Sequence, residues 1–252
     1  MSIYRNPEKI CRFIESWLAE KVSASGAGGI VLGISGGIDS AVVAGLASRV
    51  CGPENVLGVI MPSHSMPVDE EYARLLPEAF GIRAVKADLS ASYDAVKAAI
   101  EQSGTTLSPL AAANIKPRLR MATLYAFAQQ YGYLVCGGSN RVEFAYGYFT
   151  KHGDSGVDLL PLADLLKGEV RLLAEYIGVP RQIIDRPPTA GLWEGQTDED
   201  EMGLSYADLD RYLATGAAEP AVREKIEAGI ARSAHKRSPI PMAILPADIR
   251  PE

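Results

Sequence analysis

Residues 33–40 read GISGGIDS and lie between an apolar run and a second run with helical character. The adjacent glycines Gly36 and Gly37 let backbone N–H groups turn inward, because no Cβ atom stands in the way. A helix that starts directly behind them adds partial positive charge. Ser35 and Ser40 supply hydroxyl groups. These features together predict a site that holds phosphate.

Asp39 is the residue of this loop that needs a further explanation. A carboxylate beside a phosphate is unfavourable alone, but a Mg2+ ion between the two resolves the conflict, since Mg2+ takes carboxylates together with phosphate oxygens. We therefore expect a polyphosphate bound with Mg2+. The alternative is a plain helix start that Ser40 or Asp39 caps. The loop lacks the lysine of GxxxxGK[ST] and the spacing of GxGxxG, which excludes a Walker loop and a dinucleotide fingerprint.

Strand-like and helix-like segments alternate around this loop. Continuous apolar runs predict strands at residues 30–34, 56–61, 83–89 and 133–136. Helical spacing of apolar residues predicts helices at 6–22, 40–50, 69–80, 91–102 and 111–131. Strands that are apolar on both faces are typical of a parallel sheet covered by helices on both sides. We expect a three-layer, doubly wound, Rossmann-like α/β fold that forms a single domain over residues 1–252.

The periodicity weakens after residue 137. A turn and a helix resume over residues 159–177, and a short helix over 206–213 begins after Ser205, with Asp208 three residues on. Residues 185–205 are expected to form a mobile acidic loop.

Composition limits the possible partners. The 252 residues are 47% hydrophobic with a net charge of -6, which argues against a protein that coats nucleic acid. An anionic ligand must therefore be held by local cations. No apolar run reaches the length of a membrane helix, and the N-terminus lacks the order of a signal peptide. The three separated cysteines, Cys11, Cys51 and Cys136, predict buried thiols in a reducing cytoplasm.

The SGGxDS pattern of the loop resembles the pyrophosphate loop of the ATP pyrophosphatases, the adenine nucleotide alpha hydrolase-like superfamily. Further blocks resemble the NAD synthetase family, in the same order and over nearly the whole chain. These blocks are NIKPRLRM (114–121), GGSNRVEFAYGYFTKHGD (137–154), LLPLADLLKGEV (159–170), PPTAGLW (187–193), QTDEDEMGLSYADLDRYL (196–213) and HKR (235–237). No glutaminase segment accompanies them, so the resemblance implies the ammonia-dependent form.

The resemblance implies a ligase that amidates deamido-NAD with ammonia in the last step of NAD biosynthesis. ATP would be the co-substrate and Mg2+ the cofactor, and an acyl-adenylate would form before AMP and pyrophosphate are released. The resemblance also implies a cytoplasmic homodimer with the dinucleotide site at its interface. Its partners would be small molecules, and neither nucleic acid nor a membrane.

The same resemblance assigns roles to individual residues. ATP contacts fall on Gly33, Ile34, Ser35, Gly36, Gly37, Ile38, Asp39, Ser40, Lys167 and Thr189. Deamido-NAD contacts fall on Arg118, Lys151, Asp158, His235 and Lys236, with the tail 232–252 closing on the substrate. Asp39 and Glu143 would hold Mg2+. Lys167 would neutralise charge at the α-phosphate, and Asp158 is the candidate to bind ammonium or accept its proton.

One position departs from the family pattern. The family has threonine in GTxxxxE, whereas this chain has Gly138 at that place, followed by Ser139 and, at the end of the pattern, Glu143. The ATP contact at Gly138 is therefore expected either from its backbone or from the hydroxyl of Ser139.

Several residues also have plain structural interpretations. Arg118 and Lys167 could equally be charged residues on the exposed face of a helix, and residues 235–236 could be part of a frayed basic tail. The acidic residues 198–201 could be metal ligands or part of a solvated loop. Trp193 and Tyr206 could stack on a nucleotide base or pack in the hydrophobic core.

Two other functions compete with the family resemblance. Another ATP pyrophosphatase, such as a tRNA-thiolating or GMP-forming enzyme, is the nearest, but a tRNA enzyme would show a basic face and paired cysteines. A non-catalytic nucleotide-binding protein of the stress-protein kind would leave Glu143, Lys151 and Lys167 unexplained.

Overall fold

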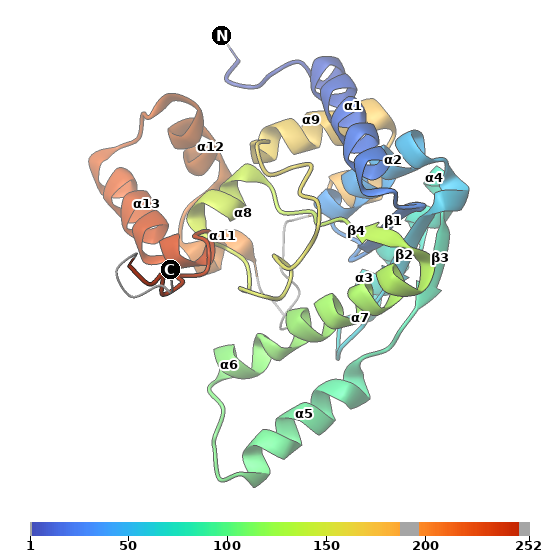
Figure 1. Cartoon of the computed structure of the whole chain (residues 1–252). Helices are drawn as coiled ribbons and strands as arrows, with labels where there is room; N and C mark the ends of the chain where they lie inside the picture. The colour runs from blue at the N-terminus through green and yellow to red at the C-terminus, as the bar shows by residue number, and fades with distance from the viewer. Residues whose placement is uncertain (1, 187–196, 247–252) are drawn as a thin grey trace.

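The computed structural model of the chain describes residues 2–186 and 197–246. Within these residues a parallel four-stranded sheet has the order β3-β2-β1-β4 (Figure 1). The strands are β1 (Gly29–Gly33), β2 (Val56–Ile60), β3 (Arg83–Lys86) and β4 (Tyr133–Val135). Ile30 of β1 is aligned with Val56 of β2 and with Leu134 of β4. The strand β1 therefore lies inside the sheet, as its fully apolar sequence predicts.

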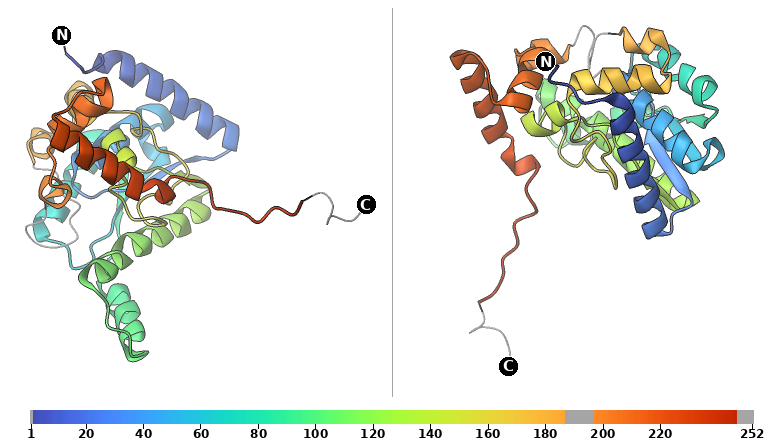
Figure 2. Two further views of the ribbon diagram at one scale, coloured as in Figure 1. Left: turned by 90° about the vertical axis from the view of Figure 1, so that its left-hand side faces the viewer. Right: turned by 90° about the horizontal axis from the view of Figure 1, so that it is seen from above.

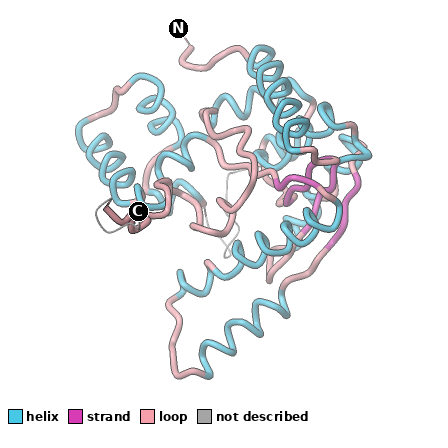
Figure 3. The backbone as a smooth tube through the Cα atoms, in the orientation of Figure 1, coloured by secondary structure: helices cyan, strands magenta, loops and turns pink. Residues whose placement is uncertain are grey.

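Helices cover both faces of this sheet (Figure 3). On one face lie α1 (Pro7–Ser25), α2 (Ile38–Cys51), α4 (Leu75–Phe80) and α9 (Lys167–Ile177). On the other face α7 (Ile115–Tyr131) packs on the strands, and α5 (Ser90–Gln102) packs on α7. Successive residues of β1 point to opposite faces, so that Ile30 and Leu32 join one core and Val31 the other. The predicted three-layer α/β fold is confirmed.

A further group of helices lies beside the sheet and has its own small core of Val142, Leu209 and Ile226. This group comprises α8 (Arg141–Tyr146), α11 (Asp198–Met202), α12 (Tyr206–Thr215) and α13 (Pro220–Arg232). The remaining short elements are η1 (Pro53–Asn55), α3 (Pro67–Ala73), α6 (Pro109–Ala113), α10 (Arg181–Ile184) and η2 (Ala234–Lys236). After η2 the chain extends away from the body of the protein (Figure 2). Among the described helices, none combines the length and apolar character that crossing a membrane requires.

Two predicted helices are each interrupted once, and proline explains both breaks. The helix predicted over 69–80 is divided into α3 and α4, and the helix predicted over 111–131 into α6 and α7. A proline ring clashes with the carbonyl four residues earlier and leaves it without a donor. Pro77 and Pro117 therefore end the preceding helices at Ala73 and Ala113, four residues before each proline.

Other differences concern the second half of the chain. Part of the acidic stretch predicted as a loop over 185–205 is helical, because the Thr197 side chain accepts a hydrogen bond from the Asp200 N–H and starts α11. The helix predicted after Ser205 is confirmed, with the Ser205 side chain accepting from the Asp208 N–H. The helices α8 and α13 were not predicted.

A buried carboxylate joins the N-terminal segment to α9. Glu169 accepts hydrogen bonds from the Arg5 backbone N–H (2.9 Å) and from the Arg5 Nε (2.7 Å), and it also accepts from the Leu166 N–H (3.0 Å). Burial raises the pKa of Glu169, but the hydrogen bonds from Arg5 outweigh that effect and the pKa is lowered. Glu169 is therefore ionised and fixes the first turn of α9, which begins at Lys167.

We expect Glu169→Gln to lower the free energy of unfolding by about 2–3 kcal/mol, because the substitution removes one charge of a pair whose acidic member is buried. Asp164→Asn is the matched control: Asp164 accepts from the same arginine but is exposed, so the loss should stay below about 1 kcal/mol. Urea unfolding followed by circular dichroism measures both values. Equal losses in the two variants would contradict this role for Glu169.

Candidate active site

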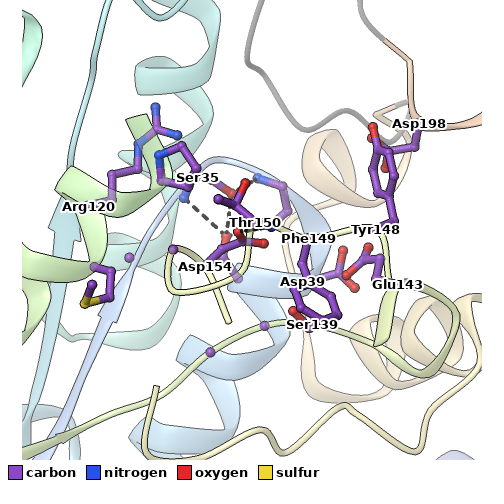
Figure 4. A pocket seen from close by; sticks show the side chains of 18 of the residues that line it. Ser35, Asp39, Arg120, Ser139, Glu143, Tyr148, Phe149, Thr150, Asp154 and Asp198 are labelled. Carbon is purple, nitrogen blue, oxygen red and sulfur yellow. Dashed lines mark hydrogen bonds between the residues drawn. The ribbon is translucent and has the colours of Figure 1, made fainter. Parts of the chain in front are cut away.

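A cavity of about 1220 Å³ opens at the C-terminal edge of the sheet (Figure 4). The chain order switches here, since β2 follows β1 on one side and β4 returns on the other. Open α/β sheets bind ligands at such a switch point. The loops after β1 and β4 face each other: a Cβ atom added at Gly138 would lie 3.5 Å from the Asp39 Cβ and from the Ser40 N.

The 33–40 loop presents an open helix end. The N-cap of α2 is Gly37, and no side chain caps it, so the alternative of a helix start capped by Ser40 or Asp39 does not hold. Gly36 has a φ of +77°, and a Cβ atom there would lie 2.6 Å from the Asp69 carbonyl oxygen, so only glycine fits. The loop lines the cavity through every residue from 33 to 40 except Gly36. Its geometry therefore suits an anion above the N-terminus of α2.

Lys167, Asp39 and Glu143 meet at one side of the cavity, although they come from three different helices. The Lys167 Nζ lies 2.6 Å from the Asp39 Oδ2 and 3.4 Å from the Glu143 Oε1. Burial, followed by the charge of Asp39, raises the pKa of Glu143. Burial opposes the charge on Lys167, but the two carboxylates outweigh it and raise the lysine pKa. Lys167 is therefore a buried, charged residue and not an exposed helix lysine.

Asn140 holds both carboxylates of this cluster and was missed by the sequence analysis. Its Oδ1 accepts from the Glu143 N–H (3.1 Å), and its Nδ2 donates to the Asp39 Oδ1 (3.1 Å). Its own N–H donates to the Glu143 Oε2 (3.2 Å), which completes a capping box at the start of α8. The spacing Asn-x-x-Glu is a recognisable capping signal and could have revealed Asn140.

Asp210 positions Lys167 from a distant part of the chain. Its carboxylate accepts from the backbone N–H groups of Lys167 and Gly168, both at 2.9 Å, and so caps the first turn of α9 from α12. Asp210 is buried. No local sequence signal marks it, because its partners lie more than forty residues earlier.

Tyr206 and Asp198 extend the network behind Glu143. The Tyr206 hydroxyl lies 2.8 Å from the Asp198 Oδ2 and 3.4 Å from the Glu143 Oε1, and its ring centroid lies 4.9 Å from the Lys167 Nζ. Asp198 is buried rather than solvated, and burial raises its pKa. Even so, across residues 2–186 and 197–246 no three Asp, Glu, His or Cys side chains come close enough to hold a metal ion together.

Several predicted substrate contacts line the same cavity from distant segments. The Arg118 guanidinium donates to two backbone carbonyls, one of them that of Lys151 (3.3 Å). The Lys151 Nζ donates to the His235 carbonyl (3.1 Å). The Lys236 Nζ donates to two carbonyls of the loop after α8 (2.6 and 2.7 Å). Residues 235 and 236 are thus fixed to the cavity wall, which differs from a frayed tail.

Asp158 does not line the cavity. Its Oδ1 accepts from the Tyr125 hydroxyl (3.0 Å) and its Oδ2 from the Val135 N–H (2.8 Å), so it supports the end of β4. Asp154, four residues earlier, does line the cavity and accepts from the Thr150 N–H (2.8 Å). Burial raises the pKa of Asp154. Thr189 and Trp193 lie outside the described residues.

Comparison with known proteins identifies the family. A family model described as NAD synthase matches residues 10–240. The NH(3)-dependent NAD(+) synthetase of Finegoldia magna is 50% identical over 92% of this chain and 94% of that protein. The enzyme of the same name from Syntrophomonas wolfei is 46% identical over 97% of this chain and 99% of its own.

Solved structures of similar fold carry two related names. The NMN synthetase of Francisella tularensis superposes with a TM-score of 0.89 and 38% identity, covering 96% of this chain and 99% of that one. The NH3-dependent NAD synthetase of Campylobacter jejuni superposes with a TM-score of 0.78 and 29% identity, covering 96% and 100%. The protein is therefore an enzyme, a ligase that belongs to the NAD synthase family.

Proposed function

We propose that this enzyme amidates deamido-NAD with ammonia and ATP in the cytoplasm, yielding NAD, AMP and pyrophosphate. The observation that carries the proposal is the cluster of Lys167, Asp39 and Glu143 beside the open N-terminus of α2. Arg118 and Lys151 line the same cavity and are suited to a second anionic substrate. The names of the relatives that match nearly the whole chain support the same activity.

The residues present fit a Mg2+ ion. With both carboxylates ionised, Asp39, Glu143 and Lys167 carry a combined charge of about -1, which favours a divalent cation. Asp39 and Glu143 would each supply a carboxylate, and phosphate oxygens would complete the coordination. When bound, Mg2+ neutralises polyphosphate charge and polarises phosphoryl oxygens.

The first step activates the substrate acid. A carboxylate oxygen of deamido-NAD forms a bond to the α-phosphorus of ATP, and the bond from that phosphorus to the bridging oxygen of the β-phosphate breaks, with its electron pair leaving on pyrophosphate. The N–H groups of the 33–40 loop and the hydroxyls of Ser35 and Ser40 hold the departing pyrophosphate. The acyl-adenylate then carries a good leaving group, so no nucleophilic side chain is needed.

The second step forms the amide. Ammonia, formed when ammonium loses a proton, attacks the acyl carbon; the bond to AMP breaks with its electron pair leaving on AMP, and the second proton that the nitrogen loses goes to the phosphate of AMP. We assign the proton released from ammonium to Asp154, because it is a buried carboxylate of the cavity whose raised pKa brings it closer to that of a base useful at neutral pH. Asp154 thus takes the role first given to Asp158, whose two oxygens are already engaged.

We expect Asp39→Ala to lower the formation of AMP and NAD by at least about 100-fold, since the variant loses a carboxylate of the metal site and a partner of Lys167. The assay contains ATP, Mg2+, deamido-NAD and ammonium, and chromatography measures both products. Asp185→Ala, which changes an exposed carboxylate, is the control and should keep full activity. Full activity in Asp39→Ala would contradict the proposed loop function. A wild-type protein that forms neither product would support a non-catalytic nucleotide binder.

Metal affinity should rise with pH, because the raised pKa of Glu143 keeps its neutral form populated at neutral pH, whereas a metal ligand must lose its proton. We expect Mn2+ binding to strengthen between pH 6 and pH 9 by up to about tenfold per pH unit below that pKa, as one proton is released. Electron paramagnetic resonance of free Mn2+ measures this directly. Glu143→Gln should bind weakly at every pH. An affinity that is constant with pH in the wild-type protein would refute the argument.

A second candidate substrate is the corresponding mononucleotide acid. The NMN synthetase structure superposes with a higher TM-score, 0.89, than the Campylobacter jejuni NAD synthetase, 0.78. The relatives at 50% and 46% identity carry the dinucleotide name, which favours deamido-NAD. The ratio of kcat/KM for nicotinate mononucleotide and deamido-NAD, measured under one set of conditions, decides between them.

We also propose that the enzyme acts as a homodimer with the dinucleotide site at the interface. The helix α5 has no buried residue, and large apolar side chains remain exposed on it and its neighbours, including Val96, Leu110 and Tyr131. The extended segment after η2 exposes Ile240 and Met242 as well. Apolar surface of this kind is typical of a covered interface. Sedimentation velocity should show a species of twice the 27.0 kDa chain mass, and a monomer at micromolar concentration would contradict the proposal.

A further inference from the structure

Among the described residues, the hydrogen-bond partners of Arg120, a cation of the cavity, are all neutral. Its Nε donates to the Met61 carbonyl (3.1 Å) and its Nη2 to the Ser65 Oγ (3.3 Å). Lys167 and Arg186, which line the same cavity, are each paired with a carboxylate. Within the part of the chain that the structure describes, Arg120 forms no such ion pair.

The surroundings of Arg120 are unfavourable for an unpaired charge. Burial is the main influence on the pKa of Arg120 and lowers it, while the charges of Asp154 and Asp69 oppose that effect. A partly desolvated guanidinium that lacks a charged partner is costly, and an anion entering the cavity would offset this cost. The planar fork of arginine matches two oxygens of a phosphate or carboxylate.

The hydrogen bonds to Met61 and Ser65 fix the position of the Arg120 guanidinium. Met61 directly follows β2, and Ser65 belongs to the same loop. Because β2 is the neighbour of β1, this loop leaves the sheet edge beside the 33–40 loop. In Figure 4 Arg120 lies on the α7 side of the cavity, and Asp39 and Glu143 lie on the opposite side. Arg120 and the two carboxylates that would hold Mg2+ therefore face the cavity from different sides.

This placement indicates which anion Arg120 meets. In the proposed function, on which this inference rests, the departing pyrophosphate lies over the N-terminus of α2, next to Asp39. Lys167 is already held by Asp39 and Glu143, so its charge is largely balanced within the protein. The α-phosphate lies on the other side of the breaking bond, and an unpaired cation across the cavity is suited to it.

We propose that Arg120 is a catalytic residue that binds non-bridging oxygens of the ATP α-phosphate and stabilises the negative charge they gain during adenylation. The bond that forms joins the substrate carboxylate to the α-phosphorus, and the bond that breaks releases pyrophosphate. Arg120 gives up no proton in this step. It acts as a fixed positive group aimed at the developing charge.

Exchange of labelled pyrophosphate into ATP, in the presence of deamido-NAD and Mg2+ but without ammonium, isolates this step. We expect Arg120→Ala to slow the exchange by about 100-fold or more. Arg120→Lys should recover part of the loss, because charge returns without the fork. Added methylguanidine should speed the Ala variant and leave the wild type unchanged. Arg12→Ala, which changes an exposed arginine of α1 outside the cavity, is the control.

The two diastereomers of ATP with sulfur on the α-phosphate separate direct contact from a structural role. A residue that contacts one non-bridging oxygen makes the enzyme prefer one diastereomer, and Arg120→Ala should reduce that preference at least severalfold. An unchanged preference with slower exchange would overturn the proposal and leave Arg120 as a support of the loop after β2. Normal exchange in Arg120→Ala would overturn it too. If the wild-type protein shows no exchange, the proposed function itself fails.

Discussion

The buried contact of Lys167 with Asp39 and Glu143 is the interaction on which the rest of the structure depends. The three residues lie in the first turns of α9, α2 and α8, so one charge cluster joins three helices at the sheet edge. A buried ion that loses its partner is strongly destabilising, which explains why each member has additional support. Asn140 holds the two carboxylates, donating from its side chain to Asp39 and from its backbone N–H to Glu143, and Asp210 fixes the backbone of Lys167. The charge cluster of the site therefore depends on how the helices α8, α9 and α12 pack together.

The cavity divides its charges between two regions. Near Asp39 and Glu143 the cation is already paired, and the region keeps an excess of carboxylate that suits a metal ion. Elsewhere, Arg118, Arg120 and Lys151 donate to neutral oxygens. This arrangement would suit the proposed reaction between two anions: a Mg2+ ion held by Asp39 and Glu143 would screen the leaving group, and cations without a carboxylate partner among the described residues would meet the reacting groups. A net charge of -6 for the whole chain does not prevent this, because the cations are local.

The sequence predicts the sheet and the 33–40 loop well because both are local. Apolar runs locate the strands, and the two glycines with Asp39 mark a phosphate turn without any knowledge of distant residues. Pro77 and Pro117 also carry local information, and the rule that places a helix end four residues before a proline would have given both breaks.

The rest of the site depends on contacts between distant segments. Asp210 meets Lys167 across 43 residues and Tyr206 meets Glu143 across 63, and no local period encodes such distances. Asp154 and Asp158 are equally polar and only four residues apart, so their spacing could not show which of them turns into the cavity. The side-chain hydrogen bonds decide it, since the Asp158 carboxylate accepts from the Val135 N–H of β4 and from the Tyr125 hydroxyl and is held away from the cavity.

Gly138 shows how a departure from a family pattern can be judged by geometry. A Cβ atom at this position would make ordinary contacts of 3.5 Å with Asp39 and Ser40, and Gly138 does not adopt a positive φ. The backbone therefore does not require glycine, and a larger residue would enter the space beside the 33–40 loop. Ser139 is buried and lines the same cavity. Gly138 lines that cavity too, so the backbone of Gly138 and the hydroxyl of Ser139 both remain available for the contact that the family's threonine would make.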